Sequence, residues 1–508
     1  MKLEDFPAEI RDLVIPKAKG EITYQCLGCN KEFPIHQLLY TCPDCQGLVM
    51  IIDKDSHRFK EIPGETWQKT FDYRKMLNMS ALKGIFLYYE FIAPLIPLDQ
   101  IIYLGEGHTS LVPVNDFMKD FVGMEFYFKN DGQNPSASFK DRGMACALSY
   151  INYLANTLGI KDILAICAST GDTSASAALY GSYLHQTVRS AVLVPQGKIT
   201  KVQLSQPLGS GAYVFEIPGV FDDCMKVVEN LADNYNVALL NSKNAWRIRG
   251  QESYAFEISQ DLDYDTSKKV VVVPIGNAGN ITAIISGFLR FYQAGIIKAL
   301  PKVIGVQSTH ANPVYRYYLE RDLNKRIFSP VVVKPSVAQA AMIGNPVSMP
   351  RVIKLVQEYE EKAGNERFFM VEVTEQEIMD CQLTANRNGH FICTQGGESL
   401  AGLIRAFKNR VVQEDEIAIL DSTAHALKFY TFQEMYFNDS FSPDFEILPR
   451  RELQNSPRLI RPKGLDTFPE PGKSLPPKDL KRFIELTSEE IAAILNLQKR
   501  EGAFSRLS

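Results

Sequence analysis

The chain has 508 residues, of which 45% are hydrophobic and 22% are charged, which is the ordinary composition of a globular enzyme. A chain of this length is long for a single hydrophobic core, so two or three domains are expected. Its 55 lysines and arginines against 59 aspartates and glutamates give a net charge of −4 without a long run of one sign, which argues against a nucleic-acid-binding surface.

No segment is typical of a membrane or secreted protein. A membrane-spanning helix needs about 18 or more consecutive apolar residues. The nearest approach, residues 84–96, is shorter and contains Glu90. The first residues do not lead into the apolar core of a signal peptide. We therefore expect a cytoplasmic enzyme without a membrane partner.

Four cysteines near the N-terminus form two C-x-x-C pairs, separated by a short segment with a hairpin-like pattern. They are Cys26, Cys29, Cys42 and Cys45. This spacing lets four thiolates surround one tetrahedral zinc, or an iron in the same type of site. Disulfide bonds are the alternative, which a cytoplasmic location disfavours. The sequence thus predicts a zinc-ribbon-like element at residues 20–52, with a structural metal.

Residues 53–124 are expected to form a helical connection and an entrance loop, in which His108 is more simply interpreted as structural than as catalytic. From residue 125 onward, strand-like runs alternate with helical periods. This alternation predicts right-handed βαβ units and parallel sheets. We assign residues 125–217 to a smaller α/β domain and residues 218–442 to a larger one. Two open sheets leave a cleft between them where ligands bind.

The predicted strands lie near residues 125–129, 163–168, 189–194 and 213–217 in the smaller domain, and near 238–241, 269–275, 302–307, 367–373 and 416–420 in the larger one. Helices are expected near residues 141–158, 173–185 and 198–208. Residues 443–508 are rich in proline and charge, and they are predicted to form a C-terminal arm. A capping-box pattern at Thr487 predicts a last helix within that arm.

Lys140 stands at the junction of a turn and a helix, in the segment Asn-Pro-Ser-Ala-Ser-Phe-Lys-Asp-Arg-Gly at residues 134–143. A helix N-terminus is electropositive, so it favours the neutral form of an amine. A neutral lysine amine is required to form a Schiff base with an aldehyde cofactor. A solvated surface lysine is the alternative for this residue taken alone.

Two turns between a strand and a helix are suited to binding anions through their free backbone N–H groups. One is Gly-Asn-Ala-Gly-Asn at residues 276–280, which follows a run of valines. The other, at residues 169–174, follows a strand and precedes a helix of small residues. Together with Lys140, the two turns indicate pyridoxal phosphate and an anionic substrate.

These segments, with Asn-Ser-x-Asn-x-x-Arg at residues 241–247 and Ser-Thr-Ala-His-Ala-Leu-Lys at 422–428, occur in the order found in one family. Over roughly residues 100–430 the chain resembles the threonine synthases, which are tryptophan-synthase-β-like (fold type II) pyridoxal phosphate enzymes. The resemblance implies an α/β fold with two open, twisted, mainly parallel sheets flanked by helices. Some threonine synthases also carry a similar cysteine ribbon.

For the cofactor, the resemblance implies that Lys140 holds pyridoxal phosphate and that Thr423 faces the pyridine nitrogen. The cofactor phosphate would bind the backbone of Gly276, Asn277, Ala278, Gly279 and Asn280. Asp172 stands where many relatives have Asn, against the phenolic oxygen of the cofactor. A carboxylate repels a phenolate unless the two share a proton or a cation lies between them.

For the substrate, the resemblance implies conversion of O-phospho-L-homoserine and water to L-threonine and phosphate. Ser169 and Thr173 match substrate-contacting positions, and Asn241 and Arg247 match the pair that contacts the substrate phosphate. Asn244 and Lys198 are further candidates. The segment Cys-Thr-Gln-Gly-Gly-Glu-Ser-Leu at residues 393–400 departs from the usual sequence of the family at this position.

Other functions remain open at the level of sequence. Threonine dehydratase, diaminopropionate ammonia-lyase and cysteate synthase could share Lys140, whereas a simple dehydratase has no need of Arg247. A non-enzymatic zinc-ribbon scaffold is a further alternative, against which the intact Lys140 and Thr423 count. The resemblance also implies a homodimer.

Overall fold

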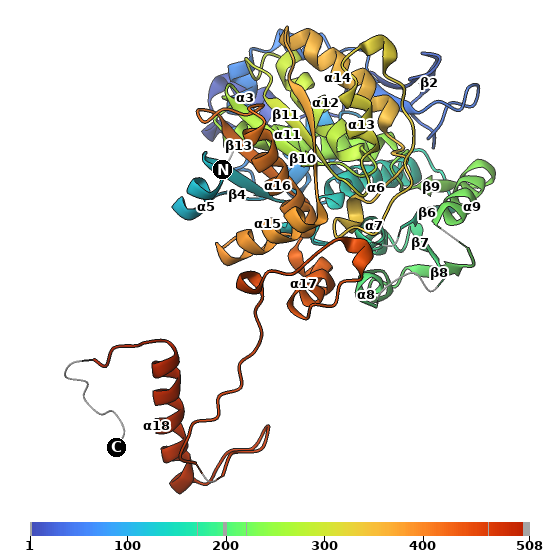
Figure 1. The fold of residues 1–508 in the computed structure, drawn as a ribbon. Helices are drawn as coiled ribbons and strands as arrows, with labels where there is room; N and C mark the ends of the chain where they lie inside the picture. Colours follow the sequence, from blue (N-terminus) through green and yellow to red (C-terminus); the bar gives the residue numbers. More distant parts are fainter. Residues whose placement is uncertain (1–2, 170, 197–200, 220, 466, 501–508) are drawn as a thin grey trace. The chain divides into compact units, whose positions relative to one another are not determined.

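A computed structural model describes residues 3–169, 171–196, 201–219, 221–465 and 467–500. The chain divides into two units, Met1–Leu453 and Gln454–Ser508. The first unit contains three β-sheets (Figure 1). Among the described residues, no helix is long and apolar enough to cross a membrane.

A run of valines forms the centre of the largest sheet. Val270, Val271, Val272 and Val273 are all fully buried, because this strand is covered on both faces. Val271 and Val273 join one hydrophobic core, and Val270 and Val272 join another. In spatial order the strands are β12 (Phe368–Val373), β11 (Lys302–Ser308), β10 (Lys269–Pro274), β13 (Ile417–Ser422), β5 (Phe126–Asn130) and β4 (Leu111–Pro113). All pair in parallel except β4.

Helices cover both faces of this sheet. The core that contains Val271 includes residues of α10 (Ala245–Gln251), α11 (Ser253–Asp261), α12 (Gly279–Gln293), α13 (Pro313–Leu319) and α14 (Met349–Ala363). The core that contains Val270 includes residues of α5 (Asp116–Val122), α15 (Glu375–Arg387), α16 (Thr394–Lys408) and α17 (Tyr430–Phe437). The predicted α/β architecture is confirmed.

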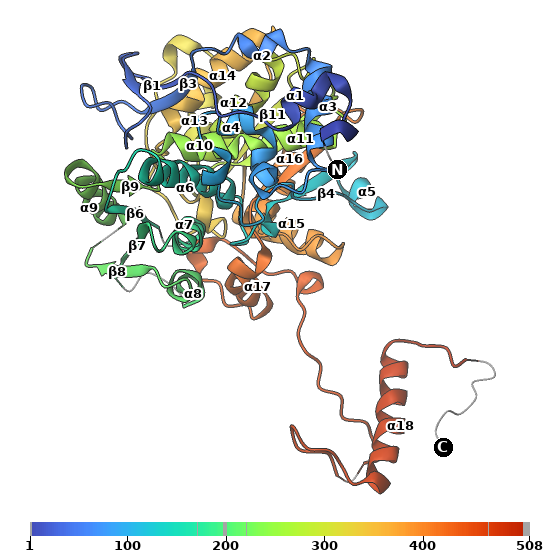
Figure 2. The same ribbon diagram turned by 180° about the vertical axis from the view of Figure 1, so that it is seen from behind.

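A second, fully parallel sheet has the order β8 (Tyr213–Ile217), β7 (Val188–Pro195), β6 (Ile163–Ala168) and β9 (Val237–Leu239). One face packs on α6 (Lys140–Asn156) and α7 (Asp172–Tyr183), and the other face packs on α9 (Phe221–Asn234). The helix α8 (Lys201–Gly209) leads into β8. Figure 2 shows this sheet and its helices from behind.

Two strands were assigned to the wrong sheet by the sequence. The strand expected near residues 125–129 is β5, which pairs with β13 in the six-stranded sheet. The strand expected near residues 238–241 is β9, which pairs with β6 in the four-stranded sheet. The chain therefore enters the smaller sheet after β5 and leaves it after β9, so a boundary at residues 217/218 does not separate the two sheets. Alternation along a chain predicts strands, but not which sheet each strand joins.

The N-terminal sheet contains β1 (Ile22–Cys26), β2 (Glu32–Pro34) and β3 (Val49–Asp53), in the antiparallel order β2-β1-β3. The first cysteine pair lies in the turn from β1 to β2, so the prediction of a hairpin between the pairs was wrong. Around this sheet the chain forms α1 (Arg11–Val14), α2 (Arg58–Glu61), α3 (Gly64–Arg74) and α4 (Tyr89–Ile92).

The C-terminal unit contains one long helix, α18 (Pro477–Ile494). Proline is well suited to the first helical position, because its missing N–H has no partner there in any case. The sequence-based prediction of a helix start at Thr487 was wrong, since Thr487 lies inside the helix. No residue of α18 is buried within the described structure.

The start of α6 is held by a fully buried guanidinium. Arg142 forms bidentate contacts with Asp131, at 2.8 and 2.7 Å, and with Glu257, at 2.5 and 2.8 Å. It also donates to the hydroxyl groups of Thr109 and Ser253. Lys129 of β5 lies 3.1 Å from Glu257. These contacts connect α6 with β5 and α11, and they fix the position of Lys140, two residues earlier.

Two glycines allow α6 and α10 to touch backbone to backbone. A Cβ on Gly250 would lie 2.2 Å from the carbonyl oxygen of Arg142, and one on Gly143 would lie 2.9 Å from the carbonyl oxygen of Arg247. Such distances exclude any side chain unless the helices move apart. The close contact brings Arg247 next to the helix that begins at Lys140.

We predict that Arg142→Met strongly destabilises the protein, because it leaves Asp131 and Glu257 buried without their main cation. Removing one partner of a buried ion pair typically costs about 3–5 kcal/mol. Urea unfolding of the cofactor-free protein measures this loss. The control is Arg189→Met, which removes an exposed pair with Asp162 at 3.7 Å and should leave the midpoint nearly unchanged. Equal midpoints for the two variants would contradict the prediction.

Candidate active site

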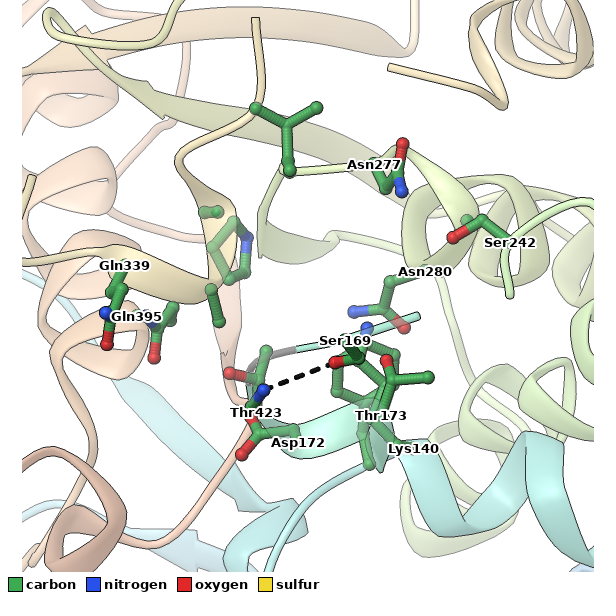
Figure 3. A pocket seen from close by; sticks show the side chains of 18 of the residues that line it. Lys140, Ser169, Asp172, Thr173, Ser242, Asn277, Asn280, Gln339, Gln395 and Thr423 are labelled. Atoms are coloured by element: carbon green, nitrogen blue, oxygen red, sulfur yellow. Dashed lines mark hydrogen bonds between the residues drawn. The ribbon is translucent and has the colours of Figure 1, made fainter. Parts of the chain in front are cut away.

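One cavity of about 1000 Å³ collects most of the cofactor- and substrate-binding residues predicted from the sequence. They are Lys140, Ser169, Asp172, Thr173, Asn241, Arg247, Gly276, Asn277, Ala278, Gly279, Asn280 and Thr423. The residues at 169, 172, 173, 241 and 247 follow β6 and β9 of the smaller sheet, whereas those at 140, 276–280 and 423 follow β5, β10 and β13 of the larger sheet. Figure 3 shows Lys140, Ser169, Asp172, Asn280 and Thr423 around one space. Their individual roles stay predictions.

Lys140 is the first residue of α6, and its ammonium lies 4.2 Å from the centre of the Phe139 ring. Desolvation inside the cavity and, to a smaller extent, the cation of Arg247 lower the pKa of Lys140 to about 7. The carboxyl groups of Asp172 and Asp421 act in the opposite direction. Among the described residues Lys140 makes no ion pair. Its amine is therefore largely available as a neutral nucleophile near neutral pH.

Lys140 and Thr423 are connected through a short backbone pairing. The N–H of Phe139 donates to the carbonyl of Thr423 at 2.9 Å, and the N–H of His425 donates to the carbonyl of Ala137 at 3.0 Å. Ala137 adopts a left-handed conformation with φ 65°, a strained state that neighbouring contacts must hold. The hydroxyl of Thr423 lies 3.6 Å from the Cys393 sulfur. The predicted anchoring lysine and the predicted pyridine partner are thus fixed to each other.

The turn at residues 276–280 joins β10 to α12, and Ala278 adopts φ 60° directly before the helix. The first N–H groups of a helix have no intrahelical partner, so this turn offers donors to an anion. A Cβ on Gly276 would lie 2.8 Å from the Cα of Ala341, which shows how closely a second loop passes. The Asn280 side chain donates to Asp421 at 2.6 Å.

Asp172 is the first residue of α7 and is almost fully buried. The ammonium of Lys428 lies 3.0 Å from its carboxylate. The sequence raised the question of a cation beside Asp172 without identifying Lys428, although that residue ends the segment at 422–428.

Gln395, on the cavity wall, was also missed by the sequence analysis. Among the described residues, neither atom of its side-chain amide has a hydrogen-bond partner. The feature that could have indicated Gln395 is the segment at residues 393–400, whose sequence departs from the usual family pattern.

Arg247 is buried within the cavity wall, with only 2% of its surface exposed. One nitrogen donates to the carbonyl of Leu240 at 2.9 Å, while its Nε has no partner. Within the described part of the chain it makes no ion pair, and burial lowers the pKa of Arg247 to about 10. A buried guanidinium without a counter-ion is well suited to an incoming anion.

The other predicted polar residues differ in their hydrogen-bond partners and in whether they line the cavity. Asn241 contacts both the N–H and the carbonyl of Ala168, at 3.0 and 2.7 Å, so its amide mainly closes the end of β6. Asn244 is not among the residues that line the cavity, and it caps α10 instead, accepting from the N–H of Trp246 at 2.9 Å. Lys198 lies outside the described residues. His108 stacks on Tyr88, away from this cavity, and burial lowers its pKa to about 4.

The four N-terminal cysteines converge at one point. Their sulfur atoms all lie within 4.8 Å of one another, with 3.4 Å between Cys26 and Cys45 and 3.7 Å between Cys29 and Cys42. The N–H of Gly28 donates to the sulfur of Cys26 at 3.3 Å. Four converging sulfur donors fit a tetrahedral metal.

Comparisons with known proteins agree with this geometry. The family model described as "Pyridoxal-phosphate dependent enzyme" matches residues 102–422. A threonine synthase of Methanocaldococcus jannaschii is 34% identical over 405 residues, which are 80% of this chain and 92% of that protein. Threonine synthase 2, chloroplastic, of Arabidopsis thaliana is 33% identical over 79% of this chain and 75% of that protein.

The solved structure of Escherichia coli threonine synthase covers 94% of this chain and 100% of that one, with a TM-score of 0.59 and 19% identity, which is a likeness of fold. The chain belongs to the family of pyridoxal-phosphate-dependent enzymes. Its resemblance to the threonine synthases, predicted from the motifs, is confirmed by these relatives.

We predict that Lys140→Ala removes the visible absorption that pyridoxal phosphate gains when the cofactor-free protein binds it, because the amine that anchors the aldehyde is lost. In the parent chain, the rate of this absorption change should rise with pH and level off above about 7, since the amine reacts unprotonated and its pKa is about 7.

Stopped-flow absorbance across a pH series measures that rate. A rate that keeps rising toward the pKa of an ordinary lysine, about 10.4, would contradict the lowered pKa. The control is the unfolding midpoint of Lys140→Ala, which should change little, since Lys140 has no ion-pair partner among the described residues.

Proposed function

We propose that this chain is a threonine synthase, which converts O-phospho-L-homoserine and water to L-threonine and phosphate. The relatives named threonine synthase, at 33–34% identity over most of the chain, support the assignment. The observation that carries it is the unpaired, buried guanidinium of Arg247 in the same cavity as Lys140.

The cavity offers more than one place for an anion. The turn at residues 276–280 suits the cofactor phosphate, as the family predicts. Arg247 lies on α10 and is not part of that turn. A second anion therefore has to come from the substrate, and a phosphate matches the planar, multi-donor guanidinium best. The N-terminus of α7, with Ser169 and Thr173, remains for the substrate carboxylate.

Lys140 supplies the proton transfers. Bound pyridoxal phosphate supplies the electron sink that stabilises negative charge on the substrate. A free Lys140 amine with a pKa of about 7 can take protons from the substrate Cα and Cβ and return protons to Cγ and Cα near neutral pH. Phosphate leaves from Cγ and water adds at Cβ.

Release of inorganic phosphate from O-phospho-L-homoserine, with the amino-acid product identified, tests this function. Threonine and phosphate in equal amounts are the expected products. A threonine dehydratase, a diaminopropionate ammonia-lyase or a cysteate synthase would give other products. Membership of the family of pyridoxal-phosphate-dependent enzymes argues against a non-enzymatic scaffold.

We predict that Arg247 decides the preference for a phosphorylated substrate. Arg247→Ala removes a charge-assisted contact, a loss of roughly 1.5–3 kcal/mol, or about ten- to a hundred-fold in kcat/KM for O-phospho-L-homoserine. Unphosphorylated serine or threonine should be affected little. Arg247→Lys should recover only part of the loss, because the planar fork is gone.

The matched control is Arg351→Lys. Arg351 is as deeply buried, but it donates to the carbonyl groups of Ser242 and Lys243 rather than lining the cavity. Its replacement should change stability without changing the ratio of the two kcat/KM values. If Arg247→Ala lowers both substrates equally, Arg247 is structural, and the case for a phosphorylated substrate loses its main residue.

We further propose that Cys26, Cys29, Cys42 and Cys45 hold one structural zinc, or an iron in the same site. The convergence of the four sulfur atoms supports this. Four protein ligands leave no open position for a substrate, so the metal would stabilise the N-terminal sheet rather than take part in chemistry.

We predict about one metal ion per purified chain, as expected for a four-cysteine site. Cys29→Ser combined with Cys45→Ser should remove it and lower the unfolding midpoint, while Cys224→Ala, at a buried cysteine of α9 outside the cluster, should retain it. Elemental analysis and thermal unfolding provide the two measurements. The absence of any metal, or a disulfide between the two pairs, would contradict the proposal.

The homodimer and the cytoplasmic location stay predictions from the sequence. Sedimentation analysis of the full chain measures the first of these.

A further inference from the structure

Lys428 makes three contacts, one for each N–H of its ammonium. It lies 3.0 Å from the Asp172 carboxylate, 2.8 Å from the carbonyl of Ser136 and 3.1 Å from the side-chain oxygen of Gln206. These partners belong to α7, to the turn before α6 and to α8. Lys428 itself follows β13 of the larger sheet. Two hydrogen bonds and one ion pair thus hold the ammonium in place.

The pair of Asp172 and Lys428 lies inside the cavity, where charges interact more strongly than in water. Only 5% of the Asp172 side chain and 16% of the Lys428 side chain are exposed. A carboxylate and an ammonium at this distance compensate each other. The pair therefore presents little net charge to whatever occupies the cavity, although each member alone would present a full one.

Other titratable groups interact electrostatically with the pair from the surrounding elements. They are Lys140 and Asp141 from α6 and Cys393 before α16, while Arg247 of α10 and Asp421 of β13 act on Lys140. Burial raises the pKa of Asp421 well above its usual range and that of Cys393 to about 11, so the Cys393 thiol is neutral at physiological pH. Asp141 accepts hydrogen bonds from Ser136 and Ser176. Among the described groups, Lys428 is the cation that forms an ion pair with Asp172.

We propose that Lys428 is a positioning residue that neutralises Asp172, so that a carboxylate can lie against the phenolic oxygen of pyridoxal phosphate while that oxygen remains unprotonated. The proposal rests on the proposed function only in requiring the cofactor to bind at Lys140 with its phenolic oxygen toward Asp172. Without Lys428, the carboxylate and the phenolic oxygen would repel each other, and one proton would be taken up between them.

The test is a pH titration of the visible absorption of the full chain loaded with pyridoxal phosphate. Lys428→Met should raise the midpoint of this titration by about 1 pH unit or more, the shift expected when a neighbouring opposite charge is lost. Lys428→Arg, which keeps the charge, should retain most of the original midpoint. Adding Asp172→Asn to Lys428→Met should return the midpoint toward that of the parent chain, because the unpaired carboxylate is then gone.

Gln206→Ala is the matched control. It removes one neutral acceptor of Lys428 and should leave the midpoint in place. An unchanged midpoint in Lys428→Met, or the same raised midpoint in the double variant, would overturn the proposal, since a merely structural lysine would not be rescued by Asp172→Asn. The titration uses no substrate. A failed titration is therefore distinct from a failure to release phosphate, which would overturn the proposed function instead.

Discussion

The buried guanidinium of Arg142 is the contact on which the position of Lys140 depends. All of its N–H groups are engaged, with two carboxylates and two hydroxyl groups as acceptors from α11, the turn after β5 and the loop before β4. Because the first turn of α6 is held in this way, Lys140 needs no ion pair of its own. An amine that carried a partner would be protonated and unreactive. The fixed charge two residues away therefore allows the neighbouring amine to be neutral and available.

The N-terminal sheet supports the opposite wall of the cavity. Trp246 and Arg249, on either side of Arg247 in α10, contact Tyr24 at 2.8 Å and Asp53 at 2.6 Å. Tyr24 lies in β1, which ends at Cys26, and Asp53 ends β3. A metal among the cysteines would therefore stiffen the helix that carries Arg247, without any contact with substrate. Metal loss would act on the binding of the anion before it acts on proton transfer at Lys140.

Local patterns in the sequence were sufficient to predict most strands, the cavity residues and the converging cysteines, since each of these depends on neighbours in the chain. What could not be predicted depends on contacts between distant segments. The sheet membership of β5 is decided by pairing with β13, about 290 residues later, and that of β9 by pairing with β6, about 70 residues earlier. Lys428 was missed for the same reason, since Asp172 is its partner only in the folded chain. Asn244 was misread because capping and ligand binding use the same amide.

An aspartate in place of an asparagine at residue 172 adds a negative charge that the cavity has to compensate. An asparagine amide is neutral and can donate a hydrogen bond to the phenolic oxygen unaided, whereas a carboxylate can only accept one or repel it. The ammonium of Lys428 removes this conflict, but it comes from the loop after β13, while Asp172 begins α7 beside the smaller sheet. If Asp172 faces the phenolic oxygen as proposed, the charge at that oxygen depends on contact between the two sheets. Any movement that separated them would break the pair and change the protonation of the site together with its shape.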